Sequence, residues 1–176
     1  MAAHRKLFVI IGSASANSSN LRLVNHLMQQ MPEFEYSVFN SLHSLPPFNP
    51  EQSLRDPPLA VQEFRKNIEE ADGVIICTPE YIFSIPSGLK NGIEWCVATT
   101  VFSDKPIGLI TASADGKMGH QELQLILHTL TARFSEENTL LIPGIKGKIN
   151  EDGVVTDPPT GIALLRFVDA FRKLLS

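Results

Sequence analysis

The chain has 176 residues, is 43% hydrophobic and carries a formal net charge of −4. These values predict one compact domain over residues 1–176 with a substantial buried core. Acidic and basic residues are mixed along the chain, and no apolar run could cross a bilayer, which argues against nucleic-acid and membrane partners.

Apolar and amphipathic segments alternate along the chain, and this alternation predicts strands separated by helices. Continuous apolar runs indicate strands buried on both faces, whereas apolar residues three or four positions apart indicate one face of a helix. In chain order we expect a strand at 6–11, a helix at 21–31, a strand at 35–39, a proline-rich connection at 40–58, a helix at 58–71, a strand at 73–78, a helix at 86–99, a strand at 105–112, a loop at 113–119 followed by a helix to about 133, a strand at 139–142, a hairpin at 145–156 and a helix at 159–174. This order predicts a mostly parallel sheet with helices on both faces.

The N-terminal residues enter the first predicted strand directly, without the apolar stretch of a cleavable signal. The two cysteines, Cys77 and Cys96, are too few for a disulfide framework, and we expect each to pack in the core. Both features favour a cytoplasmic protein.

The first predicted strand ends at Gly12 in a loop of small polar residues, 13–20. Hydroxyls, side-chain amides and backbone N–H groups of this loop can bind an anion, and the following helix directs the positive end of its dipole at the same place. The loop contains no Lys or Arg, so neutral donors would hold the anion. The alternative is an ordinary connection in which Asn20 caps a helix that begins at Leu21.

Three predicted loops, 12–20, 78–85 and 113–119, follow the carboxyl ends of strands, where ligands bind in parallel sheets. The second loop carries Tyr81 and Phe83 among other apolar residues. A phosphate-binding loop beside a flat apolar wall suits a nucleotide-like cofactor with a ring system.

The second loop also belongs to a longer motif. Residues 78–95 read T-P-E-Y-I-F-S-I-P-S-G-L-K-N-G-I-E-W and resemble the signature P-E-Y-N-x-S-I-P-x-x-L-K-N-x-I-D-W of NADPH-dependent FMN reductases. Residues 105–113 resemble the K-P-V-x-L-I-x-A-S strand of that family, and the resemblance covers roughly residues 6–130 in the same order and spacing. The first loop resembles the family's phosphate motif, G-S-x-R-x-x-S-x-N, at Gly12, Ser13, Ser18 and Asn20.

This resemblance implies a fold and an activity. It implies a flavodoxin-like three-layer α/β sandwich whose five-stranded parallel sheet has the strand order 2-1-3-4-5. It also implies an FMN-dependent NAD(P)H oxidoreductase in which hydride passes from NADPH or NADH to flavin N5 and then to free flavin, a quinone or a similar small acceptor. A homodimer or homotetramer follows from the same resemblance. No metal and no catalytic residue of the protein are expected, because the flavin carries the chemistry.

The resemblance assigns cofactor-binding residues in all three loops. The expected residues are Ser13, Ser15, Ser18, Ser19 and Asn20 at the FMN phosphate, Pro79, Glu80, Tyr81, Ile82 and Phe83 along the isoalloxazine ring, and Ser113, Ala114, Asp115 and Gly116 at its pyrimidine side.

The chain departs from the family pattern at two of these loops. Ser15 stands where the family has a phosphate-binding Arg, which would weaken FMN binding about tenfold or more unless another group compensates. Arg22, one turn into the following helix, is a candidate substitute. Ile82 and Phe83 stand where the family has Asn and a small residue, so a side-chain amide contact to the flavin is lost and the space beside the ring becomes narrower.

Two other functions fit these residues. The first is a flavodoxin-like electron carrier without a nicotinamide site, although such carriers are strongly acidic and this chain carries a net charge of only −4. The second is a degenerate family member that has lost FMN through the changes at Ser15, Ile82 and Phe83.

Three charged residues of the motif are interpreted as having structural roles. Glu80 is expected to bond backbone groups and shape its loop rather than act as a general base. Lys90 and Glu94 are four residues apart on the helix that follows and can form an ion pair, the alternative being a contact with another subunit.

Overall fold

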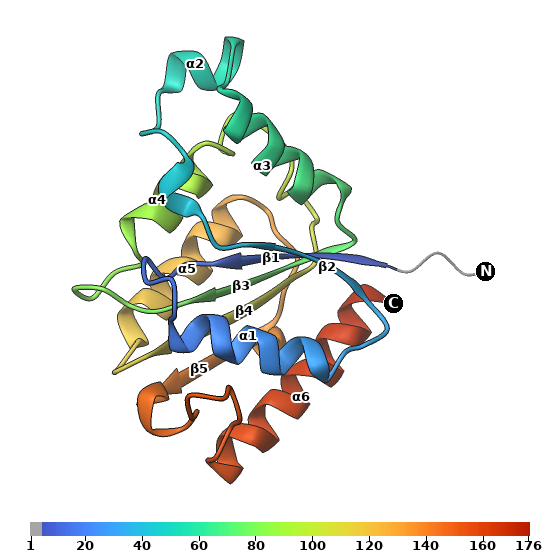
Figure 1. The fold of residues 1–176 in the computed structure, drawn as a ribbon. Coiled ribbons are helices and arrows are strands. Elements are labelled where there is room, and N and C mark those ends of the chain that lie inside the picture. Colours follow the sequence, from blue (N-terminus) through green and yellow to red (C-terminus); the bar gives the residue numbers. More distant parts are fainter. Residues whose placement is uncertain (1–4) are drawn as a thin grey trace.

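The computed structural model describes residues 5–176, so residues 1–4 of the predicted domain lie outside the described residues. A five-stranded parallel sheet forms the middle layer (Figure 1). Its strands are β1 (Lys6–Ile11), β2 (Glu35–Phe39), β3 (Gly73–Thr78), β4 (Ile107–Ser113) and β5 (Thr139–Pro143). Their order, β2-β1-β3-β4-β5, confirms the predicted flavodoxin-like topology.

Helices cover both faces of this sheet. In Figure 1, α1 (Ser19–Gln29) and α6 (Pro158–Leu175) lie on one face. The opposite face is covered by α3 (Leu59–Glu70), α4 (Ser87–Glu94) and α5 (Lys117–Thr129). The three layers are therefore helix, sheet and helix, as predicted.

The first strand shows why the chain needs two helical layers. Leu7, Val9 and Ile11 pack with α1 and α6, whereas Phe8 and Ile10 pack with α3, α4 and α5. Successive side chains of a strand point to opposite faces, so a continuous apolar run is buried only when both faces are covered. The same alternation in β3 and β4 divides the core into two apolar clusters.

The start of α1 corrects one expectation. Ser18, not Asn20, is the N-cap, and its hydroxyl accepts a hydrogen bond of 3.1 Å from the N–H of Leu21. The helix therefore begins two residues earlier than expected. Asn20 cannot act as the cap because its side chain is buried and bonded to the sheet.

Two predicted segments have a different secondary structure. The proline-rich connection contains a 3₁₀ turn, η1 (Leu42–Ser44), and a short helix, α2 (Pro50–Arg55), which Asn49 caps. The predicted hairpin at 145–156 is reduced to the 3₁₀ turn η3 (Ile145–Gly147) and a single antiparallel bridge between Ile149 and Val155. A further 3₁₀ turn, η2 (Glu136–Asn138), precedes β5.

Two motif residues, one on α4 and one directly after it, form hydrogen bonds with the proline-rich connection. The carboxamide of Asn91 donates to the carbonyl of Pro46 at 3.0 Å and accepts from the N–H of Phe48 at 2.8 Å. The indole N–H of Trp95 donates to the same Pro46 carbonyl at 2.8 Å, and its ring meets that of Phe48 edge to face. The last residues of the motif therefore hold a loop that is distant in sequence.

The expected ion pair on α4 is wrong. The ammonium of Lys90 lies 3.7 Å from the carboxylate of Glu122 on α5, and no ion pair with Glu94 is formed within residues 5–176. The helix ends at Glu94, five residues before the predicted end, so Glu94 lies in a terminal turn and Lys90 pairs with the neighbouring helix instead.

Asn91→Ala should lower the free energy of unfolding by about 1–3 kcal/mol, because it leaves the Pro46 carbonyl and the Phe48 N–H without their side-chain partner. Urea denaturation of the purified variant measures the change. Lys90→Ala is the control, since it removes only a partly exposed ion pair and should cost less than about 1 kcal/mol. An equal loss in both variants would contradict the bracing role of Asn91.

Candidate functional site

The carboxyl ends of β1, β3, β4 and β5 open onto one cavity of about 1080 Å³. This volume lies at the upper limit of small-molecule and cofactor sites, which are about 300–1,000 Å³. The cavity is lined by Ser13, Ser15, Asn17, Ser18, Ser19, Asn20, Arg22, Pro79, Tyr81, Ala112, Ser113, Ala114, Gly144, Ile145, Lys146, Gly147, Ile149, Asn150 and Glu151.

Glycine is required where β1 enters the first loop. The N–H of Gly12 continues the sheet by donating to the carbonyl of Cys77 at 2.8 Å. A Cβ atom on this residue would lie only 2.2 Å from Oγ1 of Thr78, so a larger residue would push β1 away from β3. The loop then turns over the sheet, and the N–H of Ser15 donates to the Ser13 hydroxyl at 3.2 Å.

The first turn of α1 presents free donors to the cavity. Within residues 5–176, the backbone N–H groups of 17–20 have no hydrogen-bond partner. Such groups at the start of a helix are the usual donors to a phosphate or another anion. The loop therefore has the geometry that an anion site requires.

Asn20 joins the first loop to two strands. Its side-chain N–H donates to the carbonyl of Ala112 on β4 at 3.1 Å, and its side-chain oxygen lies 3.3 Å from the Cys77 sulfur on β3. Burial raises the pKa of the Cys77 thiol, which stays protonated and donates this bond. Asn20 is thus a buried brace beneath the loop, and its predicted contact with a phosphate stays a prediction.

Glu80 joins the second loop to the third. Its carboxylate accepts from the N–H of Gly119 at 2.8 Å and from the N–H of Gly116 at 3.4 Å, at the N-terminus of α5. The hydroxyl of Ser113 accepts from the N–H of Glu80 at 3.1 Å. This confirms the expectation that Glu80 bonds backbone groups and shapes the loop.

The tip of the second loop is a strained two-residue turn. Tyr81 and Ser84 exchange two backbone hydrogen bonds, of 2.9 and 3.1 Å, across Ile82 and Phe83. Both central residues have a positive φ, of 52° and 59°, and they are 94% and 71% exposed. Turns of this shape favour Asn-Gly, and the left-handed conformation costs an ordinary residue roughly 1–2 kcal/mol.

Glu122 on α5 anchors the base of this turn. Its carboxylate accepts from the Ser84 hydroxyl at 2.7 Å and from the N–H of Ile85 at 2.9 Å, and Lys90 lies beside it. Burial raises the pKa of Glu122, but these hydrogen bonds and the charge of Lys90 outweigh it, so the pKa is lower than usual. The turn is therefore held at its base while its apolar tip stays exposed.

The comparison with known protein families decides the assignment. The family of NADPH-dependent FMN reductases matches residues 5–146 of the chain. The chain belongs to this family. The match includes the first three loops of the cavity and extends to Lys146, a residue of the fourth.

Individual relatives agree with this assignment. A quinone reductase of Escherichia coli (strain K12) is 29% identical in an alignment of 165 positions, which covers 92% of this chain and 86% of the relative. An NAD(P)H:quinone oxidoreductase of Solanum tuberosum is 30% identical in an alignment of 181 positions, which covers 96% of this chain and 92% of the relative. Among solved structures, the flavoenzyme NAD(P)H:(acceptor) oxidoreductase FerB from Paracoccus denitrificans has a TM-score of 0.79, with 25% identity over 97% of each chain.

The cavity fits the cofactor that gives the FMN reductase family its name. Unpaired N–H groups at the start of α1 offer donors for a phosphate. The side chains of Pro79 and Tyr81 offer an apolar wall beside them, and the Tyr81 hydroxyl lies 3.4 Å from that of Ser13. The guanidinium of Arg22 adds a positive charge, and its buried Nε has no partner within the described residues.

Nine of the fourteen predicted cofactor-binding residues line the cavity: Ser13, Ser15, Ser18, Ser19, Asn20, Pro79, Tyr81, Ser113 and Ala114. The other five, Glu80, Ile82, Phe83, Asp115 and Gly116, belong to the same loops, within two residues of a lining residue, but do not line it. Which of the fourteen touch a cofactor stays a prediction.

The fourth wall of the cavity was not predicted from the sequence. It is formed by residues 144–147 and 149–151, which follow β5. The signal was available, because the loop after β5 lies at the same edge of a parallel sheet as the other three. Interpreting 145–156 as a hairpin removed that loop from consideration.

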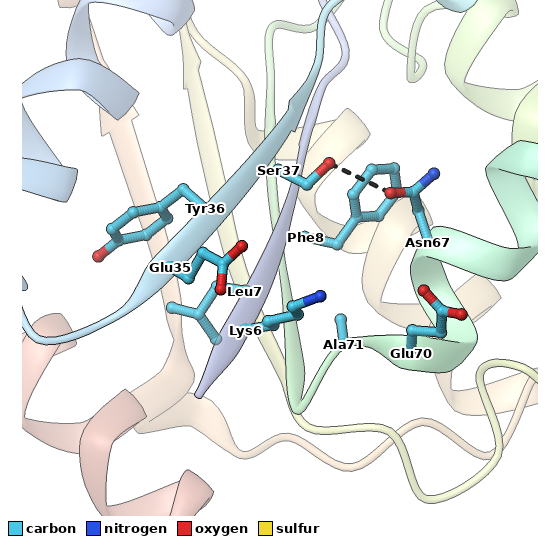
Figure 2. A pocket seen from close by; sticks show the side chains of 9 residues that line it. All are labelled: Lys6, Leu7, Phe8, Glu35, Tyr36, Ser37, Asn67, Glu70 and Ala71. Carbon is cyan, nitrogen blue, oxygen red and sulfur yellow. Dashed lines mark hydrogen bonds between the residues drawn. The ribbon is translucent and has the colours of Figure 1, made fainter. Parts of the chain in front are cut away.

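Other candidate residues of the described chain do not line this cavity. His120 is buried and bonded to the Thr111 hydroxyl at 2.8 Å, and burial lowers its pKa. A second cavity, of about 250 Å³, lies at the amino ends of β1 and β2, opposite the loops, and Figure 2 shows Ser37 donating to Asn67 there. Within residues 5–176, no His, Cys, Asp or Glu cluster could hold a metal ion and no helix is long and apolar enough to span a membrane.

Replacing Ile82 and Phe83 together by Asn and Gly should raise the free energy of unfolding of the cofactor-free protein by about 1–3 kcal/mol, because both residues adopt a left-handed backbone. Urea denaturation measures this change. Val97→Asn also replaces an exposed apolar residue, but one without a positive φ, and should change stability by less than about 0.5 kcal/mol. A less stable Asn-Gly variant would show that the turn stores no strain.

Proposed function

We propose that this chain is an FMN-dependent NAD(P)H oxidoreductase that reduces a small flat acceptor such as a quinone, an azo compound or free flavin. The observation that carries the proposal is a donor-rich loop at the start of α1 beside an apolar wall, in one cavity of a chain from the FMN reductase family. The names of its relatives, which include quinone reductases and an azoreductase, support the choice of acceptors.

In this proposal, different loops of the cavity bind different parts of FMN. Loop 13–20 binds the phosphate through the N–H groups of the first helical turn and through its hydroxyls. Pro79 and Tyr81 flank the ring system on one side, and Ser113 and Ala114 contact its polar edge. When bound, FMN supplies hydride transfer from the nicotinamide to the acceptor, so the chain itself provides binding and orientation.

The rim of the cavity favours flat apolar acceptors. Ile82 and Phe83 are exposed beside the lining residue Tyr81, and the bonds of Glu122 to Ser84 and Ile85 keep them there. Aromatic acceptors gain from contact with such a surface, whereas small charged ones do not. Acceptor and nicotinamide would use this space in turn.

The proposal also includes an oligomeric state and a cellular compartment. A homodimer or homotetramer would cover exposed apolar residues such as Met118 and Leu125 on α5, next to the loops of the site. We also propose that the enzyme works in the cytoplasm. An electron carrier without a nicotinamide site is not favoured, because the curated relatives are named as reductases and oxidoreductases.

The absorption spectrum of the purified protein tests the function. After FMN is added and excess flavin removed, the protein should retain the visible flavin bands, and NADPH or NADH should bleach them without a chemical reductant. Steady-state kinetics with a quinone should follow a ping-pong scheme. Bands that bleach only with dithionite would identify a carrier, and failure to retain FMN would identify a degenerate family member.

A further inference from the structure

Arg22 is a partly buried cation of the cavity wall, and its guanidinium is incompletely bonded within residues 5–176. Its Nη2 donates to the Ser19 hydroxyl at 3.3 Å. Its Nε is buried and has no hydrogen-bond partner within residues 5–176, and the guanidinium has no carboxylate within ion-pair distance there. A buried N–H group without a partner costs free energy, so this position calls for an acceptor.

Two other arginines with a structural role make several hydrogen bonds each. Arg65 donates to the carbonyls of Ser53 and Trp95 and to the Ser53 hydroxyl. Arg172 pairs with the carboxylate of Glu33 at 2.7 Å and also donates to a backbone carbonyl. Arg22 differs from both, since it has one weak bond and faces a cavity.

The charge of the expected ligand explains this difference. A phosphate monoester carries close to two negative charges at neutral pH. Loop 13–20 holds no cation, and its Ser15 is exposed and uncharged. The cationic residues that line the cavity are Arg22 and Lys146, and Lys146 is exposed on η3.

We propose that Arg22 binds the FMN phosphate, so that this chain selects FMN over riboflavin through a helix residue instead of through a loop arginine. The inference rests on the proposed function. Arg22 lies in the first turn of α1, which follows directly on the unpaired N–H groups of 17–20, and its guanidinium already donates to the Ser19 hydroxyl of that turn. A planar guanidinium with free N–H groups forms strong, paired hydrogen bonds to phosphate oxygens.

The test compares two ligands that differ only in the phosphate. Cofactor-free protein is titrated with FMN and with riboflavin, and quenching of flavin fluorescence gives each affinity. Arg22→Gln should weaken FMN binding by about tenfold to a hundredfold and leave riboflavin binding unchanged. Arg166→Gln, an exposed arginine of α6, makes the same change in net charge and should affect neither ligand.

Stability and rescue separate a ligand contact from a structural one. Arg22→Gln removes a buried N–H that has no partner, so the melting temperature of the cofactor-free protein should not fall. Adding Ser15→Arg to Arg22→Gln should restore the preference for FMN, because it places a cation in the loop. Arg22→Met provides the same test if Arg22→Gln does not fold.

Three results would overturn the inference. If Arg22→Gln kept the preference for FMN while Lys146→Gln lost it, the phosphate would belong to Lys146. Equal weakening of FMN and riboflavin in Arg22→Gln would assign Arg22 a structural role. Wild-type protein that binds neither flavin would instead refute the proposed function, and the inference with it.

Discussion

The buried carboxamide of Asn20 is the interaction on which the site depends. Parallel strands end at the same edge of the sheet, and the start of α1 must be joined to that edge by bonds beyond the backbone ladder. Asn20 makes this joint, because its side chain bonds the Ala112 carbonyl on β4 and the Cys77 thiol on β3. The start of α1 is therefore fixed relative to two strands, and the unpaired N–H groups of its first turn point to a defined place.

A second set of side-chain hydrogen bonds joins the second loop to the third, where the flavin ring is proposed to bind. The Glu80 carboxylate bonds the N–H groups at the start of α5, and the Ser113 hydroxyl bonds the backbone of Glu80. An acidic group at a helix N-terminus is also stabilised by the helix dipole. The backbone N–H and both carboxylate oxygens of Glu80 therefore hold the second and third loops together.

Local pattern and long-range contact explain what could be predicted. The apolar run of β1 and the helical spacing of Val61, Phe64 and Ile68 are local signals, and they gave the layers of the fold. The partners of Asn91 are residues more than forty positions away, so no local pattern could reveal that this motif residue holds Pro46 and Phe48. The fourth wall of the cavity was missed for another reason, since the bridge at Ile149 is too short to make the hairpin that its turn sequence suggested.

The positions at which this chain departs from its family share one property. Within residues 5–176, the exposed side chains of Ser15, Ile82 and Phe83 make no hydrogen bond that braces the loops, whereas the side chains of Asn20 and Glu80, which follow the family pattern, do. The shape of the 82–83 turn is set by residues that flank it and not by Ile82 and Phe83 themselves. The backbone bonds between Tyr81 and Ser84 close the turn, and the bond of Ser84 to Glu122 fixes its base. Any two residues placed there must adopt a left-handed backbone, so substitutions change the charge and the apolar surface of the rim while the frame of the site stays the same.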